Sequence, residues 1–192
     1  MRKLRAVIIA LLLSGHGSVM AGWDEATEAV GRGDYVTAAK EYRPLAEQGH
    51  AVAQCNLGIL YYAGQGVPQD YEEAAKWYRK SAAQGNADAQ LHLGVMYHEG
   101  QSVSQDYGEA AKWYRKSAAQ GNADAQYNLG ILYAEGQGVP QDYVQAHMWF
   151  NIAGANGDKA GSKSRDYIAS KMTPAQITEA KKLAREWMEK HP

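Results

Sequence analysis

The sequence predicts an all-α protein in which about five helix pairs stack into a solenoid. The first observation is an internal repeat, because the segment Ala74–Gln90 recurs unchanged as Ala110–Gln126, at an offset of 36 residues. The second is that apolar residues follow helical spacing within each unit, as at Ala53, Leu57 and Leu60. A single helix pair cannot bury its apolar face, so units of this length stack on one another.

Residues 1–21 resemble a secretory signal peptide. Arg2, Lys3 and Arg5 precede the apolar run Ala6–Leu13, and small residues follow at a suitable cleavage site. An apolar run this short does not span a bilayer, which needs about 20 residues, although an uncleaved anchor is the alternative. We therefore expect a periplasmic or secreted protein with no stable membrane insertion after cleavage.

Charge and cysteine content exclude several classes of protein. The formal net charge is −1, and removal of residues 1–21 leaves 17 basic and 21 acidic side chains. Such a chain has no basic field for a nucleic acid, so we expect no nucleic-acid partner. Cys55 is the only cysteine, so no disulfide framework holds the fold, and we expect this thiol to be buried and inert.

Residues 22–48 are expected to form an N-terminal capping helix pair, over about Trp23–Gly31 and Asp34–Glu47. The second of these helices is a weak copy of the later units, since Tyr35 occupies the place that Tyr71 takes in the next unit. A terminal pair of this kind covers the apolar face of the first full unit.

Residues 49–156 contain three units of 36 residues, and each unit is predicted to form two helices. In the first unit, helix A covers about Ala51–Ala63 and ends at Gly64. Helix B begins at Asp70 and ends near Gln84.

The start of helix B carries a capping signal. Asp70 is expected to cap the helix, with Glu73 completing a capping box and Glu72 pairing with Lys76 one turn later. The capping arrangement recurs in the next two units as Asp106/Glu109 and Asp142/Gln145.

A glycine stands at the same position inside each helix A, at Gly58, Gly94 and Gly130. Glycine costs about 1 kcal/mol relative to alanine inside a helix, so a repeated glycine needs a structural reason. We expect it to allow close backbone contact with Ala74 and Ala75 of helix B, and with their copies in the later units. The aromatic residues of helix B expected to fill the core are Trp77, Trp113, Trp149, Tyr78 and Tyr114.

Residues 157–192 are expected to form C-terminal capping helices. Thr173 and Gln176 form a capping box, with Pro174 at the first position of a helix that continues to about Lys190. The residues expected to face inward are Ile177, Leu183 and Trp187, and those expected to face outward are Lys181, Arg185 and Glu186.

The repeated unit resembles the Sel1-like repeat of exported bacterial proteins, a relative of the tetratricopeptide repeat. The residues of the first unit that carry the resemblance are Ala51, Ala53, Leu57, Gly58, Tyr61, Gly64, Gly66, Val67, Asp70, Tyr71, Ala74, Trp77, Tyr78, Lys80, Ala82 and Gly85. The second unit departs at Ser102 and Ser104, and the third at Phe150 and Ile152. The resemblance implies a right-handed αα solenoid and a role in protein–protein interaction. A cysteine-rich subgroup is linked to the binding or hydrolysis of β-lactams, but this chain lacks its paired cysteines.

Helix A positions that differ among the copies are candidates for partner binding, because the framework does not fix them. Two such positions, Cys55/Leu91/Tyr127 and Tyr62/His98/Ala134, are seven residues apart and share one stripe. In tetratricopeptide-like solenoids this stripe lines the concave groove. The predicted groove residues are Asn56, Ile59, Tyr62, Leu91, His92, Val95, His98, Tyr127, Asn128 and Ile131. Their mixture of apolar, aromatic and amide groups suits a peptide or helix of a protein partner, with partly buried packing as the alternative.

The repeats carry no catalytic, cofactor or metal signature in the sequence. Cys55 has no histidine at a spacing known from catalytic sites, and His92 and His98 fall on different faces of one helix. The sequence therefore predicts an exported scaffold or adaptor, not an enzyme, which binds a protein partner without a cofactor or metal. The alternative is a cell-wall-related ligand binder or hydrolase.

Overall fold

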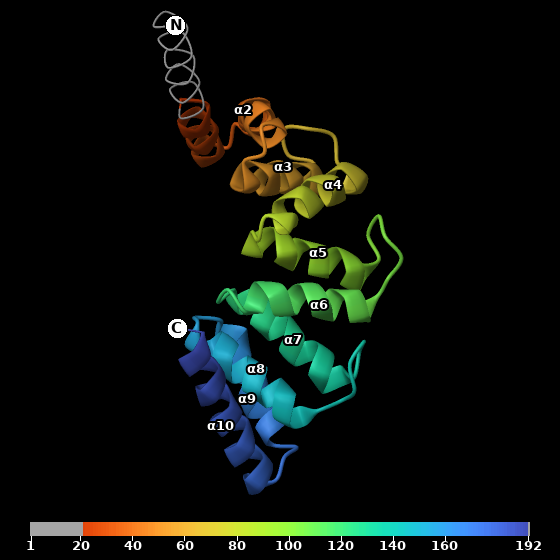
Figure 1. The fold of residues 1–192 in the computed structure, drawn as a ribbon, viewed down its shortest axis with the longest axis vertical. Helices are drawn as coiled ribbons and strands as arrows, with labels where there is room; N and C mark the ends of the chain where they lie inside the picture. The colour runs from red at the N-terminus through yellow and green to blue at the C-terminus, as the bar shows by residue number, and fades with distance from the viewer. Residues whose placement is uncertain (1–20, 192) are drawn as a thin grey trace, which may run out of the picture. The chain divides into compact units, whose positions relative to one another are not determined.

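The structure is a computed structural model that describes residues 21–191. The regular elements in this range are helices joined by turns and short loops (Figure 1), so the predicted all-α repeat fold is confirmed. The predicted signal peptide lies outside the described residues, apart from Ala21. Within residues 21–191, no helix has the length and apolar character that crossing a bilayer requires.

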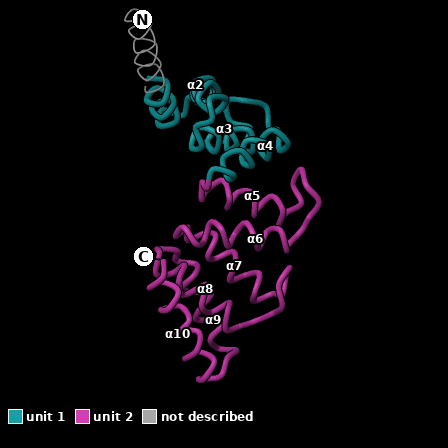
Figure 2. Tube along the Cα trace, viewed as in Figure 1, with its two compact units in different colours: residues 1–84 teal, residues 85–192 magenta. Residues whose placement is uncertain are grey.

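The chain divides into two compact units, residues 1–84 and residues 85–192 (Figure 2). The first unit contains helical residues 21–32, α2 (Tyr35–Glu47), α3 (Ala51–Ala63) and α4 (Tyr71–Ala83). Its core joins Tyr42, Leu57, Leu60 and Trp77 with buried alanines. Cys55 is 2% exposed, which confirms its predicted burial.

The second unit contains the other six helices. They are α5 (Ala87–Glu99), α6 (Tyr107–Ala118), α7 (Ala123–Glu135), α8 (Tyr143–Ala155), α9 (Lys159–Ala169) and α10 (Pro174–Lys190). The capping box of Thr173 and Gln176 is formed as predicted. The face of α10 that packs on α8 is centred on the buried Ala180 and Ala184, and Trp187 lies at its side with its ring centroid 5.4 Å from that of Trp149.

Helix B begins with an aspartate cap, but the predicted capping box is wrong. The Asp70 carboxylate accepts hydrogen bonds from the backbone N–H groups of Glu72 and Glu73, at 2.9 and 3.0 Å. The Asp70 N–H, which a box would give to Glu73, instead donates to the carbonyl of Tyr61 at 3.0 Å. Glu73 pairs with Lys76 at 2.7 Å, so the predicted Glu72–Lys76 pair is also wrong. The later aspartates donate in the same way, Asp106 to Tyr97 and Asp142 to Tyr133.

The glycines inside helix A make room for an aromatic ring and not for the alanines that we predicted. A Cβ atom at Gly58 would lie 2.7 Å from the ring of Tyr78, and one at Gly94 would lie 2.5 Å from the ring of Tyr114. A Cβ atom at Gly130 would meet the ring of Phe150 in the same way. The third unit therefore keeps the contact between glycine and ring, although phenylalanine replaces the tyrosine of the other units.

Four of the five aromatic residues predicted to fill the core are buried. They are Trp77, Trp149, Tyr78 and Tyr114. Trp113 is only half-buried, and its ring lies 4.1 Å from the ammonium group of Lys116. At this position the tryptophan supports a cation–π contact at the surface as well as packing.

Candidate functional site

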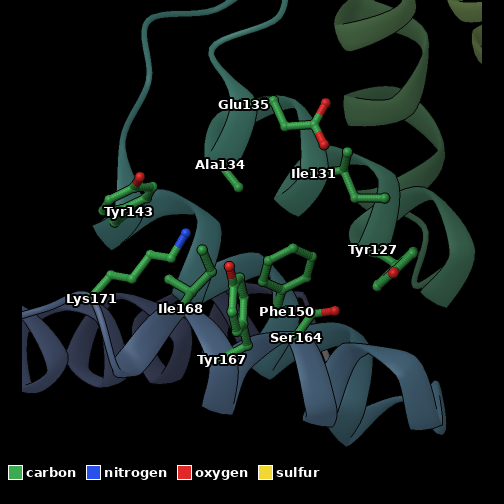
Figure 3. A pocket seen from close by; sticks show the side chains of 10 residues that line it. All are labelled: Tyr127, Ile131, Ala134, Glu135, Tyr143, Phe150, Ser164, Tyr167, Ile168 and Lys171. Atoms are coloured by element: carbon green, nitrogen blue, oxygen red, sulfur yellow. The ribbon is translucent and has the colours of Figure 1, made fainter.

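A cavity of the second unit is lined by residues of α7, α8 and α9. It has a volume of about 380 Å³, and Figure 3 shows the side chains that surround it. Its lining residues are Tyr127, Ile131, Ala134, Glu135, Tyr143, Phe150, Ser164, Tyr167, Ile168 and Lys171. In Figure 3 the Phe150 ring lies between α7 and α9, and Tyr167 and Lys171 point from the α9 side toward α7. The cavity is therefore mainly aromatic and aliphatic, with charged groups at its edge.

A second cavity of about 290 Å³ lies on the other side of α7. Its lining residues are Val95, His98, Glu99, Tyr114, Asn128, Ile131, Glu135 and Gln137. Ile131 and Glu135 line both cavities, so the two adjoin along α7. We refer to the residues of these two cavities together as the unit-2 groove.

The first unit has a smaller cavity of about 250 Å³. Its lining residues are Val30, Tyr35, Tyr42, Asn56, Ile59, Leu60 and Gln65. Burial raises the pKa of Tyr42, and a hydrogen bond from Asn56 to its side chain opposes that rise. Asn56 therefore has a structural role, because it is the hydrogen-bond partner of the buried Tyr42 phenol.

The structure distributes the ten predicted groove residues among three environments. Val95, His98, Tyr127, Asn128 and Ile131 line the unit-2 groove. Asn56 and Ile59 line the cavity of the first unit. Tyr62, Leu91 and His92 line none of these three cavities.

The residues outside the cavities have packing roles. Leu91 is 9% exposed and belongs to the core of the second unit. The ring of Tyr62 packs edge-on against Tyr71, with centroids 5.2 Å apart. Burial lowers the pKa of His92, while the carboxylates of Asp88 and Asp124 act in the opposite direction. Whether any of the ten residues binds a partner stays a prediction.

Sequence reasoning missed the part of the groove that comes from the C-terminal segment. Ser164, Tyr167 and Lys171 follow Asn128, Ile131 and Glu135 at the same offset of 36 residues. We predicted only capping helices for residues 157–192, because most framework residues of the repeat are replaced there. The offset itself was the signal that could have revealed them.

The described residues contain no cluster of three or more histidine, cysteine, aspartate or glutamate side chains placed to hold a metal ion. The histidine, carboxylate and ammonium groups of the unit-2 groove are those of His98, Glu99, Glu135 and Lys171. The ring of His98 packs edge-on against Tyr107 at 5.2 Å.

The Sel1 repeat matches three consecutive segments of the chain, residues 51–86, 87–122 and 123–158. Together these segments span more than half of the 192-residue chain. The chain belongs to the Sel1 repeat family. Sel1 repeat proteins are generally protein-interaction scaffolds and generally not catalysts. No curated protein sequence matches the chain.

Solved structures of other Sel1 repeat proteins resemble this one. A protective antigen of uropathogenic Escherichia coli shares 40% identity with a TM-score of 0.76, covering 81% of this chain and 33% of the antigen. This chain thus spans about a third of that relative. A Sel1 repeat protein from Oxalobacter formigenes shares 35% identity with a TM-score of 0.61, over 66% of this chain and 96% of its own.

A more distant structure is similar in fold alone. The cysteine-rich protein B of Helicobacter pylori shares 21% identity with a TM-score of 0.50, over 72% of this chain and 92% of its own. This Sel1 repeat chain has a single cysteine, so the likeness does not extend to the cysteine content.

Proposed function

We propose that this Sel1 repeat chain is an exported scaffold that binds a segment of a partner protein in the unit-2 groove. The observation that carries the proposal is the pair of adjoining cavities, whose lining includes helix A side chains that differ among the repeats, such as Tyr127, Asn128 and Ala134. Side chains common to all copies, such as Tyr143 and Gln137, serve the framework, whereas the variable ones are available for recognition. Aromatic anchors beside half-exposed polar groups are typical of surfaces that bind peptides.

Tyr167 is the groove residue best suited to a test. Its side chain is 61% exposed, so its loss should disturb the fold little. Tyr127 is a poorer choice, because its ring packs against Phe150 with centroids 5.5 Å apart. Val52 offers a matched control, since it is 48% exposed and lies in the first unit.

The experiment uses residues 22–192 as bait for envelope and culture-supernatant proteins. We expect a protein that is retained by the parent and by Val52→Ala, and that is lost from Tyr167→Ala. Circular dichroism should show the same helix content for all three. A protein retained equally by all three would place the binding site elsewhere.

Export is the second part of the proposal, and it is supported by the basic and apolar pattern of residues 1–21. Expression of the full chain should yield a periplasmic or secreted form whose mass corresponds to a start at Gly22. The variant Leu11→Arg places a charge in the apolar run and should leave the uncleaved chain in the cytoplasm. Cytoplasmic recovery of the parent at full mass would contradict export.

The alternative of a cell-wall-related ligand binder or hydrolase is not favoured by a particular observation. His98, Glu99 and Glu135 lie in one cavity, but the ring of His98 packs on Tyr107 and no nucleophile accompanies them among the lining residues. We therefore do not develop this alternative.

A further inference from the structure

Part of the unit-2 groove is lined by three rows of residues at the 36-residue offset, which run from α5 and α7 to α9 and the turn after it. A polar row contains Asn128 and Ser164, and an apolar row contains Val95, Ile131 and Tyr167. The third row is charged, and its members are Glu99, Glu135 and Lys171. The sign of the charge therefore reverses between the end of α7 and the turn after α9, in which Lys171 lies.

The acidic part of the charged row favours a cation for two reasons. Glu99 and Glu135 are the last residues of α5 and α7, and both line the same cavity. A helix C-terminus carries partial negative charge, which adds to that of a carboxylate there. A basic side chain of a ligand would meet both sources of negative potential at this edge of the groove.

The basic part of the row is the single residue Lys171. Its ammonium group lies 4.6 Å from the ring centroid of Tyr167 and 6.0 Å from that of Tyr143. A hydrogen bond with Tyr167 raises the pKa of Lys171, so the ammonium form predominates at neutral pH. The groups that act on it are these two tyrosines and not a carboxylate. In Figure 3 the lysine extends toward the cavity.

We propose that the partner segment, bound as in the proposed function, is an extended peptide with opposite charges on either side of a large apolar residue. Its basic side chain lies beside Glu99 and Glu135. Its apolar side chain enters the cavity between Ile131 and Tyr167. Its acidic side chain lies beside Lys171.

Dimensions favour an extended segment over a helix. Helices in direct contact lie about 8–10 Å apart, and α5, α7 and α9 alternate with α6 and α8, so successive members of a row are separated by at least about that distance. An extended chain rises about 3.3 Å per residue and covers the interval in about three residues. A helix is about 10 Å across, which is too wide for cavities of about 290 and 380 Å³ that are suited to single side chains.

The experiment compares three fluorescent heptapeptides in which the first, fourth and seventh residues are set and glycine and serine fill the rest. The mixed peptide carries Lys, Phe and Asp, and the two controls carry Lys, Phe and Lys, or Asp, Phe and Asp. The mixed peptide matches the charges in one chain direction only, so it is also made in the reverse order, Asp, Phe and Lys, and the tighter of the two is compared with the controls. The full chain should bind the mixed peptide about fivefold to tenfold more tightly than either control, as measured by fluorescence anisotropy at low salt.

The variant Lys171→Glu makes the whole charged row acidic. It should therefore prefer the peptide with two lysines, whereas the matched control Lys163→Glu should keep the preference of the parent. Lys163 is exposed on α9, whereas Lys171 lies in the turn that follows this helix, and Lys163 lines neither cavity of the groove. An unchanged preference in Lys171→Glu, or equal binding of the three peptides by the parent, would overturn the proposal.

The outcomes separate this inference from the proposed function. If the parent binds none of the peptides selectively but Tyr167→Ala still loses a captured protein, the groove binds a partner and only the charge pattern is wrong. If Tyr167→Ala affects neither the captured protein nor the peptides, both proposals fail. Selective binding that Tyr167→Ala abolishes would support both.

Discussion

At the scale of single residues, the glycines of helix A show how an unfavourable choice is offset by packing. Gly94 faces the ring of Tyr114, which is 2% exposed and cannot move aside easily. Alanine at this position would gain about 1 kcal/mol of helix propensity. Its methyl group would lie 2.5 Å from ring atoms, and overpacking of this kind typically costs about 1–3 kcal/mol.

We predict that Gly94→Ala lowers the free energy of unfolding, as measured by urea denaturation, by about 1–2 kcal/mol. Gly31→Ala is the control, because no atom lies within 4 Å of a Cβ there and the residue is exposed. It should be neutral or slightly stabilising. The double variant Gly94→Ala/Tyr114→Leu should lose less stability than the sum of the two single losses, since the clash with the ring disappears. Strict additivity would argue against a direct contact.

His147 is a second residue whose environment has a measurable consequence. It occupies the position of Ala75 and Ala111, is 1% exposed, and its Nδ1 atom has no hydrogen-bond partner in the described structure. Burial lowers its pKa, Arg165 and Lys181 lower it further, and Asp166 opposes them. The folded state therefore favours the neutral imidazole.

We predict that His147 makes the protein less stable in acid. A histidine with a depressed pKa contributes its full stability above the unfolded value of about 6.5, and that contribution is lost as the pH falls through the folded value. Thermal unfolding between pH 7.5 and pH 5 should show a smaller decrease in Tm for His147→Ala than for the parent. The exposed His191→Ala should behave as the parent does, and an equal decrease in all three would assign the effect to other groups.

At the scale of the helices, buried amides connect elements that follow one another in the chain. Gln126 of α7 is 0% exposed, and its side-chain amide donates to the carbonyl of Ala118 in α6 at 3.1 Å. Its side-chain oxygen accepts a hydrogen bond from Asn156, at the end of α8, at 2.9 Å. One side chain thus satisfies polar groups at the ends of two neighbouring helices.

We predict that Gln126→Ala destabilises the protein by about 2 kcal/mol, because it removes two hydrogen bonds made by a fully buried side chain, each worth about 1 kcal/mol. Gln141→Ala is the comparison, since Gln141 makes a single exposed hydrogen bond to Ala134 and should cost only about 0.5–1 kcal/mol. Denaturant titrations of both variants against the parent measure the difference. Equal losses would mean that burial adds nothing at Gln126.

The same scale shows what the sequence could predict and what it could not. The helix from Ala51 to Ala63 was predicted correctly because its apolar spacing and the glycine after it are local signals. The capping box at Asp70 was wrong because its N–H group bonds to Tyr61, a contact that arises only when two helices fold against each other. The contribution of Lys171 to the groove was missed for a similar reason, since the local repeat pattern around it has disappeared.

At the scale of the whole molecule, a chain of stacked helix pairs depends on how its last apolar face is covered. Here α10 packs on α8, and the buried Ala184 together with Leu183, Trp187 and Met188 extends the core around Trp149 and Ile152. Without α10, these core residues of α8 would form an exposed apolar patch, which promotes self-association.

We predict that a chain ending at Met172 binds a hydrophobic dye and self-associates in sedimentation experiments, and that its thermal transition shifts to lower temperature. A chain ending at Lys190 keeps all of α10 and is the matched control. This control should give the same result as the parent in all three measurements, because His191 and Pro192 lie beyond α10. A monodisperse chain ending at Met172, with an unchanged transition, would show that the core of the second unit is complete without α10. The role of α10 as a cap would then have to be abandoned.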